Sequence, residues 1–294
     1  MRCQDELGES AFWSPAEQAL YWIDGYAPRL HRLDWATLEH TLPRFAFDAP
    51  VGVVARAAHG FVVAAKGLYR TDLSEGPLEG PVGGYAKLIA DPEHGRDGIG
   101  YNDGKADRSG NFWFGSYDAD AVEPRGAFWR MDKTGVTTLV DSGYRVFNGP
   151  AFSPDGRVVY ASDSMARRII AYDVSETAPF LTNRRAFFDM GDMAGLPDGL
   201  TVDSAGGLWC ALWGGYGAVR FDPTGQVTDR VTVSAAQATS VALGGPGLRT
   251  QFVTSATCEL SEPDLMAQPD AGCLFGVEVS IPGLLEHPIV IDDQ

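Results

Sequence analysis

Short runs of alternating apolar and polar residues, each led by an aromatic side chain, recur along the chain. The leading aromatics are spaced about 40 to 50 residues apart: Trp22, Phe61, Trp113, Tyr160, Trp209 and Phe252. Alternation with a period of two is typical of a half-buried β-strand, whereas an amphipathic helix repeats every 3.6 residues. The pattern therefore predicts repeated copies of one strand-rich unit.

Each aromatic run is followed by a second alternating run, and most of these second runs end in an acidic residue. They lie at residues 30–34, 68–72, 128–132, 170–173, 219–222 and 275–278. Repeats of this length are typical of four-stranded propeller blades. We predict an all-β fold, a six-bladed β-propeller with four strands per blade, formed by one domain over residues 1–294. The competing interpretation is a long β-sandwich, which does not repeat with this period.

The composition fits a folded chain of 294 residues, with 45% hydrophobic and 21% charged residues. Its 35 glycines and 18 prolines are scattered, which indicates turns and no linker. No apolar stretch approaches the roughly 18 residues that span a bilayer. Residues 1–6 contain no apolar signal region, so we expect a cytoplasmic protein.

The net charge of −16 opposes binding to nucleic acid and to anionic membranes, and is indifferent to a small neutral partner. The four cysteines form no CxxC pair and have no metal-type spacing: Cys3, Cys210, Cys258 and Cys273. We expect buried reduced thiols, with a disulfide or a nucleophile as alternatives. The assembly state is open between a monomer and a weak homo-oligomer.

Four repeats carry a polar side chain with an oxygen atom about a dozen residues before the leading aromatic. These residues are Glu9, Asn102, Asn148 and Asp198. In the other two repeats, the same phase falls near residues 49–50 and 240–241. The innermost strands of a propeller line its central channel. One phase along the repeats therefore predicts one level of that channel.

Two carboxylates and two amides at one level are costly to bury unless a cation neutralises them. Glu9 and Asp198 would balance a dication, and an all-oxygen set favours Ca²⁺, Mg²⁺ or Mn²⁺ over a closed structural zinc site. The alternative is that Asn148-Gly149 and Asp198-Gly199 are only turn signals.

The most specific sequence blocks are residues 102–107, 148–156 and 197–203. Through them the chain resembles the gluconolactonase, regucalcin and senescence-marker-protein family over essentially its whole length. Residues 208–215 resemble bacterial sugar-lactonase members in particular. The resemblance implies a six-bladed propeller that holds one divalent ion (Ca²⁺, Mg²⁺, Mn²⁺ or Zn²⁺) and acts on a small sugar lactone.

The resemblance also implies roles for individual residues. It implies that Glu9, Asn148 and Asp198 bind the metal and that Asn102 and Asp120 contact the substrate. The family carries a substrate-binding arginine two residues before the asparagine of its Asn-Asp-Gly block, where this chain has Gly100. Arg96 is a candidate substitute for that arginine in the preceding loop.

The predicted activity is divalent-metal-dependent opening of aldonolactones. The metal would polarise the lactone carbonyl, and Asp198 would act as the catalytic base that activates water. The chain has no Gly-x-Ser-x-Gly elbow, so we expect no protein nucleophile. The alternatives are a metal-dependent ester or phosphotriester hydrolase on the same fold, a non-catalytic calcium-binding regulatory protein, and an interaction scaffold.

Overall fold

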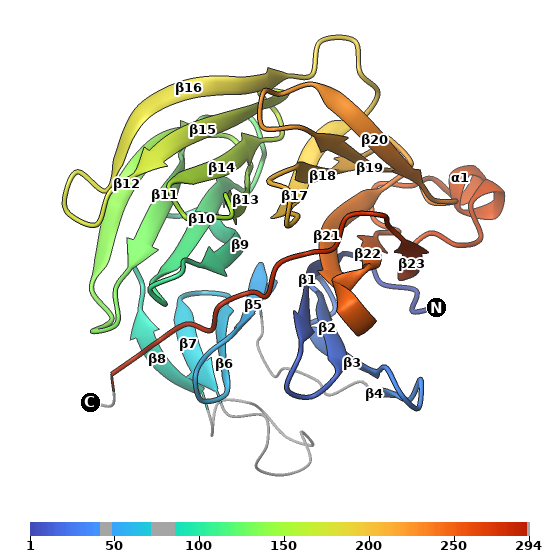
Figure 1. Ribbon diagram of the computed structural model, residues 1–294, viewed down its shortest axis with the longest axis horizontal. Helices are drawn as coiled ribbons and strands as arrows, with labels where there is room; N and C mark the ends of the chain where they lie inside the picture. Colours follow the sequence, from blue (N-terminus) through green and yellow to red (C-terminus); the bar gives the residue numbers. More distant parts are fainter. Residues whose placement is uncertain (42–48, 72–85, 293–294) are drawn as a thin grey trace.

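A computed structural model describes residues 1–41, 49–71 and 86–292. Six antiparallel sheets form a ring, as Figure 1 shows. In each sheet the first strand in the sequence lies innermost, and the chain then runs outward from strand to strand. The innermost strands of neighbouring blades contact one another around the whole ring. The prediction of a six-bladed β-propeller is confirmed.

The first three blades each contain four strands. Blade 1 consists of β1 (Gly8–Ser14), β2 (Ala19–Asp24), β3 (Arg29–Asp34) and β4 (His40–Thr41). Blade 2 consists of β5 (Val53–Arg56), β6 (Phe61–Ala64), β7 (Leu68–Thr71) and β8 (Ala86–Ala90). Blade 3 consists of β9 (Ile99–Ala106), β10 (Phe112–Asp118), β11 (Gly126–Met131) and β12 (Thr137–Tyr144).

The second half of the ring differs in its last blade. Blade 4 consists of β13 (Phe147–Phe152), β14 (Val158–Asp163), β15 (Arg168–Val174) and β16 (Leu181–Asp189). Blade 5 consists of β17 (Leu196–Val202), β18 (Leu208–Trp213), β19 (Gly217–Phe221) and β20 (Val227–Thr232). Blade 6 has β21 (Ala238–Gly244), the 3-10 helix η2 (Pro246–Leu248), β22 (Thr250–Ser255), the helix α1 (Glu262–Ala267) and β23 (Phe275–Glu278).

The prediction of four strands in every blade is wrong for blade 6, which has three in the described part of the chain. After β23 the chain leaves the sheet, and residues 279–292 cross a face of the ring (Figure 1). This C-terminal segment pairs Gly283 with Asp203 near blade 5, and Ile289 with Ala57 near blade 2. A segment that pairs with distant blades in turn cannot also form the outer strand of one blade.

The leading aromatics occupy one structural position, the second strand of each blade. All six are at most 7% exposed, and Trp22, Trp113 and Trp209 are among the largest fully buried side chains. Complete burial of one large side chain contributes about 1.5 to 3 kcal/mol. The sequence repeat therefore reflects a buried aromatic side chain on the second strand of every blade, which packs against one of the two neighbouring blades.

In blades 1, 3 and 5 the acidic residue at the end of the third strand, Asp34, Asp132 or Asp222, holds the turn that follows it. Asp132 accepts hydrogen bonds from the backbone nitrogen of Thr134 at 2.9 Å and from its hydroxyl at 2.7 Å. Asp222 accepts the same pair of bonds from Thr224, at 2.8 and 2.6 Å. A side chain that bonds its own backbone two residues on is a common turn device. Asp72, which ends the predicted run of blade 2, lies outside the described residues.

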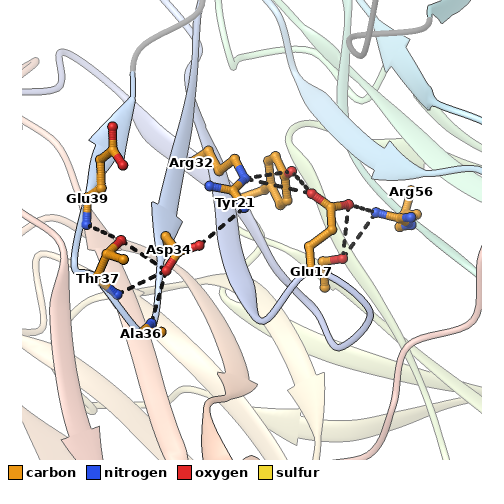
Figure 2. Close-up of polar contacts among 9 residues, drawn as sticks. Glu17, Tyr21, Arg32, Asp34, Ala36, Thr37, Glu39 and Arg56 are labelled. Carbon is orange, nitrogen blue, oxygen red and sulfur yellow. Dashed lines mark hydrogen bonds and ion pairs between the residues drawn. The ribbon is translucent and has the colours of Figure 1, made fainter.

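A polar cluster joins blade 1 to blade 2, as Figure 2 shows. Glu17 contacts the Tyr21 hydroxyl and the Arg56 guanidinium, and Arg56 also donates to Ser14 Oγ at 3.0 Å. Arg32 donates its Nε to the Tyr21 hydroxyl at 3.2 Å. The side chains of Glu17 and Arg56 are 34% and 35% exposed. Solvent weakens such ion pairs, so the cluster orients two blades more than it stabilises them.

The single described α-helix, α1, has six residues. Among the helices that the structure describes, none has the length and apolar character needed to cross a bilayer. All four cysteines are unpaired, and Cys210 and Cys273 are buried.

Candidate metal and substrate site

The four polar residues predicted to share one level do lie together. Glu9, Asn102, Asn148 and Asp198 stand on β1, β9, β13 and β17, the innermost strands of four blades, and all four line one cavity of about 250 Å³. Ser240, at the same phase on β21, instead lines a cavity with Asp103 and residues 286–288. The phase of the repeats therefore predicted a real convergence of four side chains.

The innermost strands share a local irregularity at this level. The strand register shifts between Glu9 and Phe12, between Asn148 and Ala151, and between Pro197 and Leu200. A bulge bends a strand and re-aims a side chain, and bulges concentrate beside active sites. The backbone is left-handed just after three site residues, at Ser10 (φ 55°), Asp103 (φ 28°) and Gly149 (φ 85°). The bulges thus turn the site residues toward the cavity.

A chain of hydrogen bonds fixes the amide groups across three blades. Asn102 donates its Nδ2 to the Phe147 carbonyl at 2.7 Å and to Asn148 Oδ1 at 3.0 Å. Asn148 in turn donates Nδ2 to Ser164 Oγ at 2.9 Å, and Ser164 donates to the Pro197 carbonyl at 2.7 Å. Sequence analysis did not single out Ser164, which carries no motif of its own.

The two carboxylates of the site are buried without a counter-ion. Glu9 is 7% and Asp198 6% exposed, and within the described residues neither forms an ion pair. Burial raises the pKa of Glu9 well above its usual range, and the charges of Asp198 and Asp103 raise it further. Burial and the charge of Asp103 likewise raise the pKa of Asp198. Such a pair is stabilised by added positive charge.

Asp103 lies next to this pair and adds to the negative charge. Burial raises its pKa to about 6, although Lys105 and the backbone nitrogens of Gly149 and Gly104 oppose the rise. Two buried carboxylates with an amide oxygen beside them are a donor set that suits a hard divalent cation. The residues present therefore fit the ion that the sequence predicts.

A second group of metal-type side chains, Cys3, His31 and His40, lies in blade 1 with donor atoms within 4.8 Å of one another. His31 Nδ1 and His40 Nε2 are 2.9 Å apart, and their nearly coplanar rings have centroids 5.1 Å apart, so the nitrogens meet head-on. Two nitrogens on one tetrahedral zinc would stand about 3.3 Å apart. The contact is therefore a hydrogen bond, anchored by Asp5 at 2.9 Å from His31 Nε2.

Two other predicted residues lie away from the cavity wall. Asp120 is exposed in the turn after β10, and its neighbours Ala119 and Ala121 line the cavity in its place. Its role in substrate binding stays a prediction. Arg96 lines a neighbouring cavity, where it contacts Glu93 and donates Nη2 to the Arg125 carbonyl at 2.8 Å.

Sequence analysis missed most of the cavity wall. The wall includes aromatic, apolar and acidic side chains that no motif marks, Tyr26, Tyr117, Met165 and Glu259, together with Trp213 from the block 208–215. Its described lining contains no lysine or arginine. Gly100 was the one residue singled out from the sequence that pointed to Tyr117, because the two residues are direct partners across β9 and β10.

The sequence profile of the SMP-30/Gluconolactonase/LRE-like region matches residues 7–257. The chain belongs to this family. The resemblance drawn from the sequence blocks is thereby confirmed.

Members of the family are similar to the chain over nearly its whole length. The 6-deoxy-6-sulfogluconolactonase of Pseudomonas putida is 34% identical, over 95% of this chain and 94% of the relative. The pentonolactonase of Haloferax volcanii is 32% identical, over 94% and 92%. Among solved structures, the regucalcin of Agrobacterium tumefaciens, described as a calcium-binding protein, is 26% identical with a TM-score of 0.89, over 98% and 94%.

Proposed function

We propose that this protein is a divalent-metal-dependent hydrolase that opens neutral lactones of aldonic acids. The observation that carries the proposal is the buried, uncompensated pair Glu9 and Asp198 beside Asn148 in one cavity. Relatives named as lactonases of sulfogluconate, pentonates and L-arabinonate support the reaction. The calcium-binding description of the Agrobacterium protein supports the ion.

Glu9, Asn148 and Asp198 would hold the ion, which when bound supplies positive charge that polarises the lactone carbonyl and stabilises its oxyanion. Both amide hydrogens of Asn102 are already used, on Phe147 and Asn148. Its Oδ1 is therefore the atom left to accept a hydrogen bond from a substrate hydroxyl.

Asp198 is the proposed catalytic base. Water adds to the carbonyl carbon while Asp198 takes one of its protons. The bond between the carbonyl carbon and the ring oxygen then breaks, and the proton passes to that oxygen, which gives the open aldonic acid.

The cavity lining also selects the charge of the substrate. With the ion bound, Glu9 and Asp198 are balanced by its charge, and Glu259 remains as an unbalanced acid in a cavity whose described lining has no basic side chain. An anionic substituent on the lactone would therefore be repelled and left without an ionic partner. We expect neutral pentono- and hexonolactones to be better substrates than sulfonated ones, in contrast to the name of the P. putida relative.

The test is hydrolysis of a lactone panel, followed by proton release, in chelated protein and after addition of Ca²⁺, Mg²⁺, Mn²⁺ or Zn²⁺. Turnover that disappears with chelator and returns with one ion supports the proposal. If no lactone opens faster than it does spontaneously with any ion, the proposal fails. Metal binding without turnover would then indicate a regulatory protein, and cleavage of esters or phosphotriesters alone would indicate another hydrolase.

A further inference from the structure

The aromatic ring of Tyr117 occupies the space that a side chain at position 100 would fill. Gly100 and Tyr117 are directly paired between β9 and β10. A Cβ atom added to Gly100 would lie 2.4 Å from Tyr117 Cε1, 2.7 Å from Cζ and 2.8 Å from the hydroxyl oxygen. Real Cβ atoms do not approach other atoms so closely, so any side chain at position 100 requires the ring to move.

Tyr117 also separates two cavities. Together with Ala119 it lines both the substrate cavity of about 250 Å³ and a second cavity of about 460 Å³. The second cavity is bordered by polar residues, among them Asp91, Glu93 and Arg96. Removal of the ring would therefore join a small site to a larger polar one.

The Tyr117 hydroxyl is available to a ligand. Within the described residues it makes no hydrogen bond to protein, and the atom is not sealed from solvent. Burial raises the pKa of Tyr117, so the phenol stays protonated at neutral pH. A protonated phenol both donates and accepts hydrogen bonds, as recognition of a sugar hydroxyl requires.

We propose that Tyr117 is a specificity-determining residue that restricts the site to unsubstituted monosaccharide lactones. Its ring closes the substrate cavity toward the second cavity, and its hydroxyl binds a hydroxyl of the lactone in place of a side chain at position 100. Lactones that carry a further sugar are excluded by the ring. This inference rests on the proposed lactonase function.

The first experiment compares Tyr117→Phe and Tyr117→Ala in the metal-loaded protein. The substrates are L-arabino-1,4-lactone, D-glucono-1,5-lactone and cellobiono-1,5-lactone, which carries a second glucose. Tyr216→Phe and Tyr216→Ala are the matched controls, because Tyr216 is 45% exposed and lines neither of the two cavities.

Tyr117→Phe should raise KM about fivefold for the two monosaccharide lactones with kcat nearly unchanged, because one neutral hydrogen bond is lost and the wall remains. Tyr117→Ala should shift the ratio of kcat/KM for the cellobiono- over the gluconolactone at least about tenfold upward. The Tyr216 variants should leave both quantities unchanged.

A second experiment tests the shared space directly. Gly100→Ala should lower the melting temperature and kcat/KM in the wild-type background, and should be nearly neutral in the Tyr117→Ala background, where the ring is gone. A purely structural role of Tyr117 would change the melting temperature without changing the ratio between substrates.

The outcomes separate the two proposals. If wild type opens monosaccharide lactones and Tyr117→Ala keeps the wild-type substrate ratio, the specificity role of Tyr117 is refuted while the lactonase proposal stands. If Gly100→Ala lowers the melting temperature and kcat/KM equally in the wild-type and Tyr117→Ala backgrounds, the Tyr117 ring does not occupy the space of a side chain at position 100. If wild type opens no lactone, the proposed function itself fails.

Discussion

Glu9 and Asp198 destabilise the folded protein in the absence of a cation and stabilise it when a cation is bound. Both carboxylates are buried, and the described residues offer them no ion-pair partner. A bound dication converts their mutual repulsion into ligation. Single substitutions should therefore change the stability of metal-free and metal-loaded protein in opposite directions.

Glu9→Gln and Asp198→Asn keep the side-chain shape and remove one charge each. Metal-free protein should melt at a higher temperature, because repulsion among Glu9, Asp198 and Asp103 is reduced. Metal affinity should fall by more than the roughly 10- to 100-fold that loss of an outer-shell partner costs. Calorimetric titration and thermal melts with and without Ca²⁺ measure both effects.

Glu259→Gln is the control, since this acidic residue is exposed at the cavity wall. Unchanged metal content in both the Glu9 and the Asp198 variants would show that these residues are not ligands.

Asp103 gives the metal-free protein a pH dependence. Its pKa is raised from 3.8 to about 6 in the folded state. A raised carboxyl pKa contributes stability below the unfolded pKa, and that contribution is lost as pH rises through the folded value. In chelator, the stability of wild type relative to Asp103→Asn should therefore fall between pH 5 and pH 8.

The measurement is the difference in melting temperature between wild type and Asp103→Asn at each pH, which cancels the titrating groups that do not interact with Asp103. Saturating Ca²⁺ should reduce the decline, because a bound cation compensates the ionised carboxylates. A difference that stays constant from pH 5 to pH 8 in chelator would contradict the assignment.

At the scale of strands, the sequence predicted the features that recur from blade to blade. It did not predict the contacts between particular residues on paired strands. The leading aromatics and the phase of Glu9 and Asp198 follow from a period of two within a longer repeat. The opposition of Gly100 and Tyr117 depends on the register between β9 and β10, which a bulge shifts. The contact of His31 with His40 depends in the same way on how β3 and β4 meet. Neither leaves a periodic signal.

Ser164 supports the proposed metal site from behind the ligands, because its hydroxyl accepts a hydrogen bond from Asn148 Nδ2. Ser164→Ala would leave Asn148 Nδ2 without its acceptor and free the ligand oxygen to rotate. We expect metal affinity to fall about 10- to 100-fold. The fold should persist, because each of the two buried hydrogen bonds that the Ser164 hydroxyl makes costs about 1 to 3 kcal/mol when it is lost.

Ser255→Ala is the matched control, because Ser255 is also buried and its hydroxyl donates to the Cys273 carbonyl at 2.7 Å in blade 6. Ser255→Ala should lower stability through the loss of this one hydrogen bond, without an effect on metal binding. If Ser164→Ala and Ser255→Ala have equal metal affinity, Ser164 does not support metal binding.

At the scale of the whole molecule, the C-terminal segment forms no outer strand in blade 6. It crosses the ring instead and connects blade 6 with blades 5 and 2. Ile289 is fully buried among core residues that include Val53, Leu68 and Phe112. The repeat pattern could not predict this segment, because it pairs with blades far from it in sequence and has no periodicity of its own.

Ile289→Ala should destabilise the protein by about 2 to 5 kcal/mol, as expected for truncation of a buried aliphatic side chain. Activity at temperatures where the protein is folded should be unchanged, because Ile289 does not line the substrate cavity. Chemical denaturation measures the first effect and lactone turnover the second. Val290→Ala, at a residue that is 37% exposed, is the control and should cost much less.

The acidic wall of the substrate cavity acts differently on the two ends of the proposed reaction. The lactone that arrives is neutral, and a net charge of −16 neither attracts nor repels it. The aldonate that forms carries a negative charge beside Glu259, which the bound dication does not balance, in a lining whose described residues include no basic side chain. Repulsion between Glu259 and such an ion favours its departure. Chemistry in this site would therefore create its own driving force for product release, and added salt would weaken it.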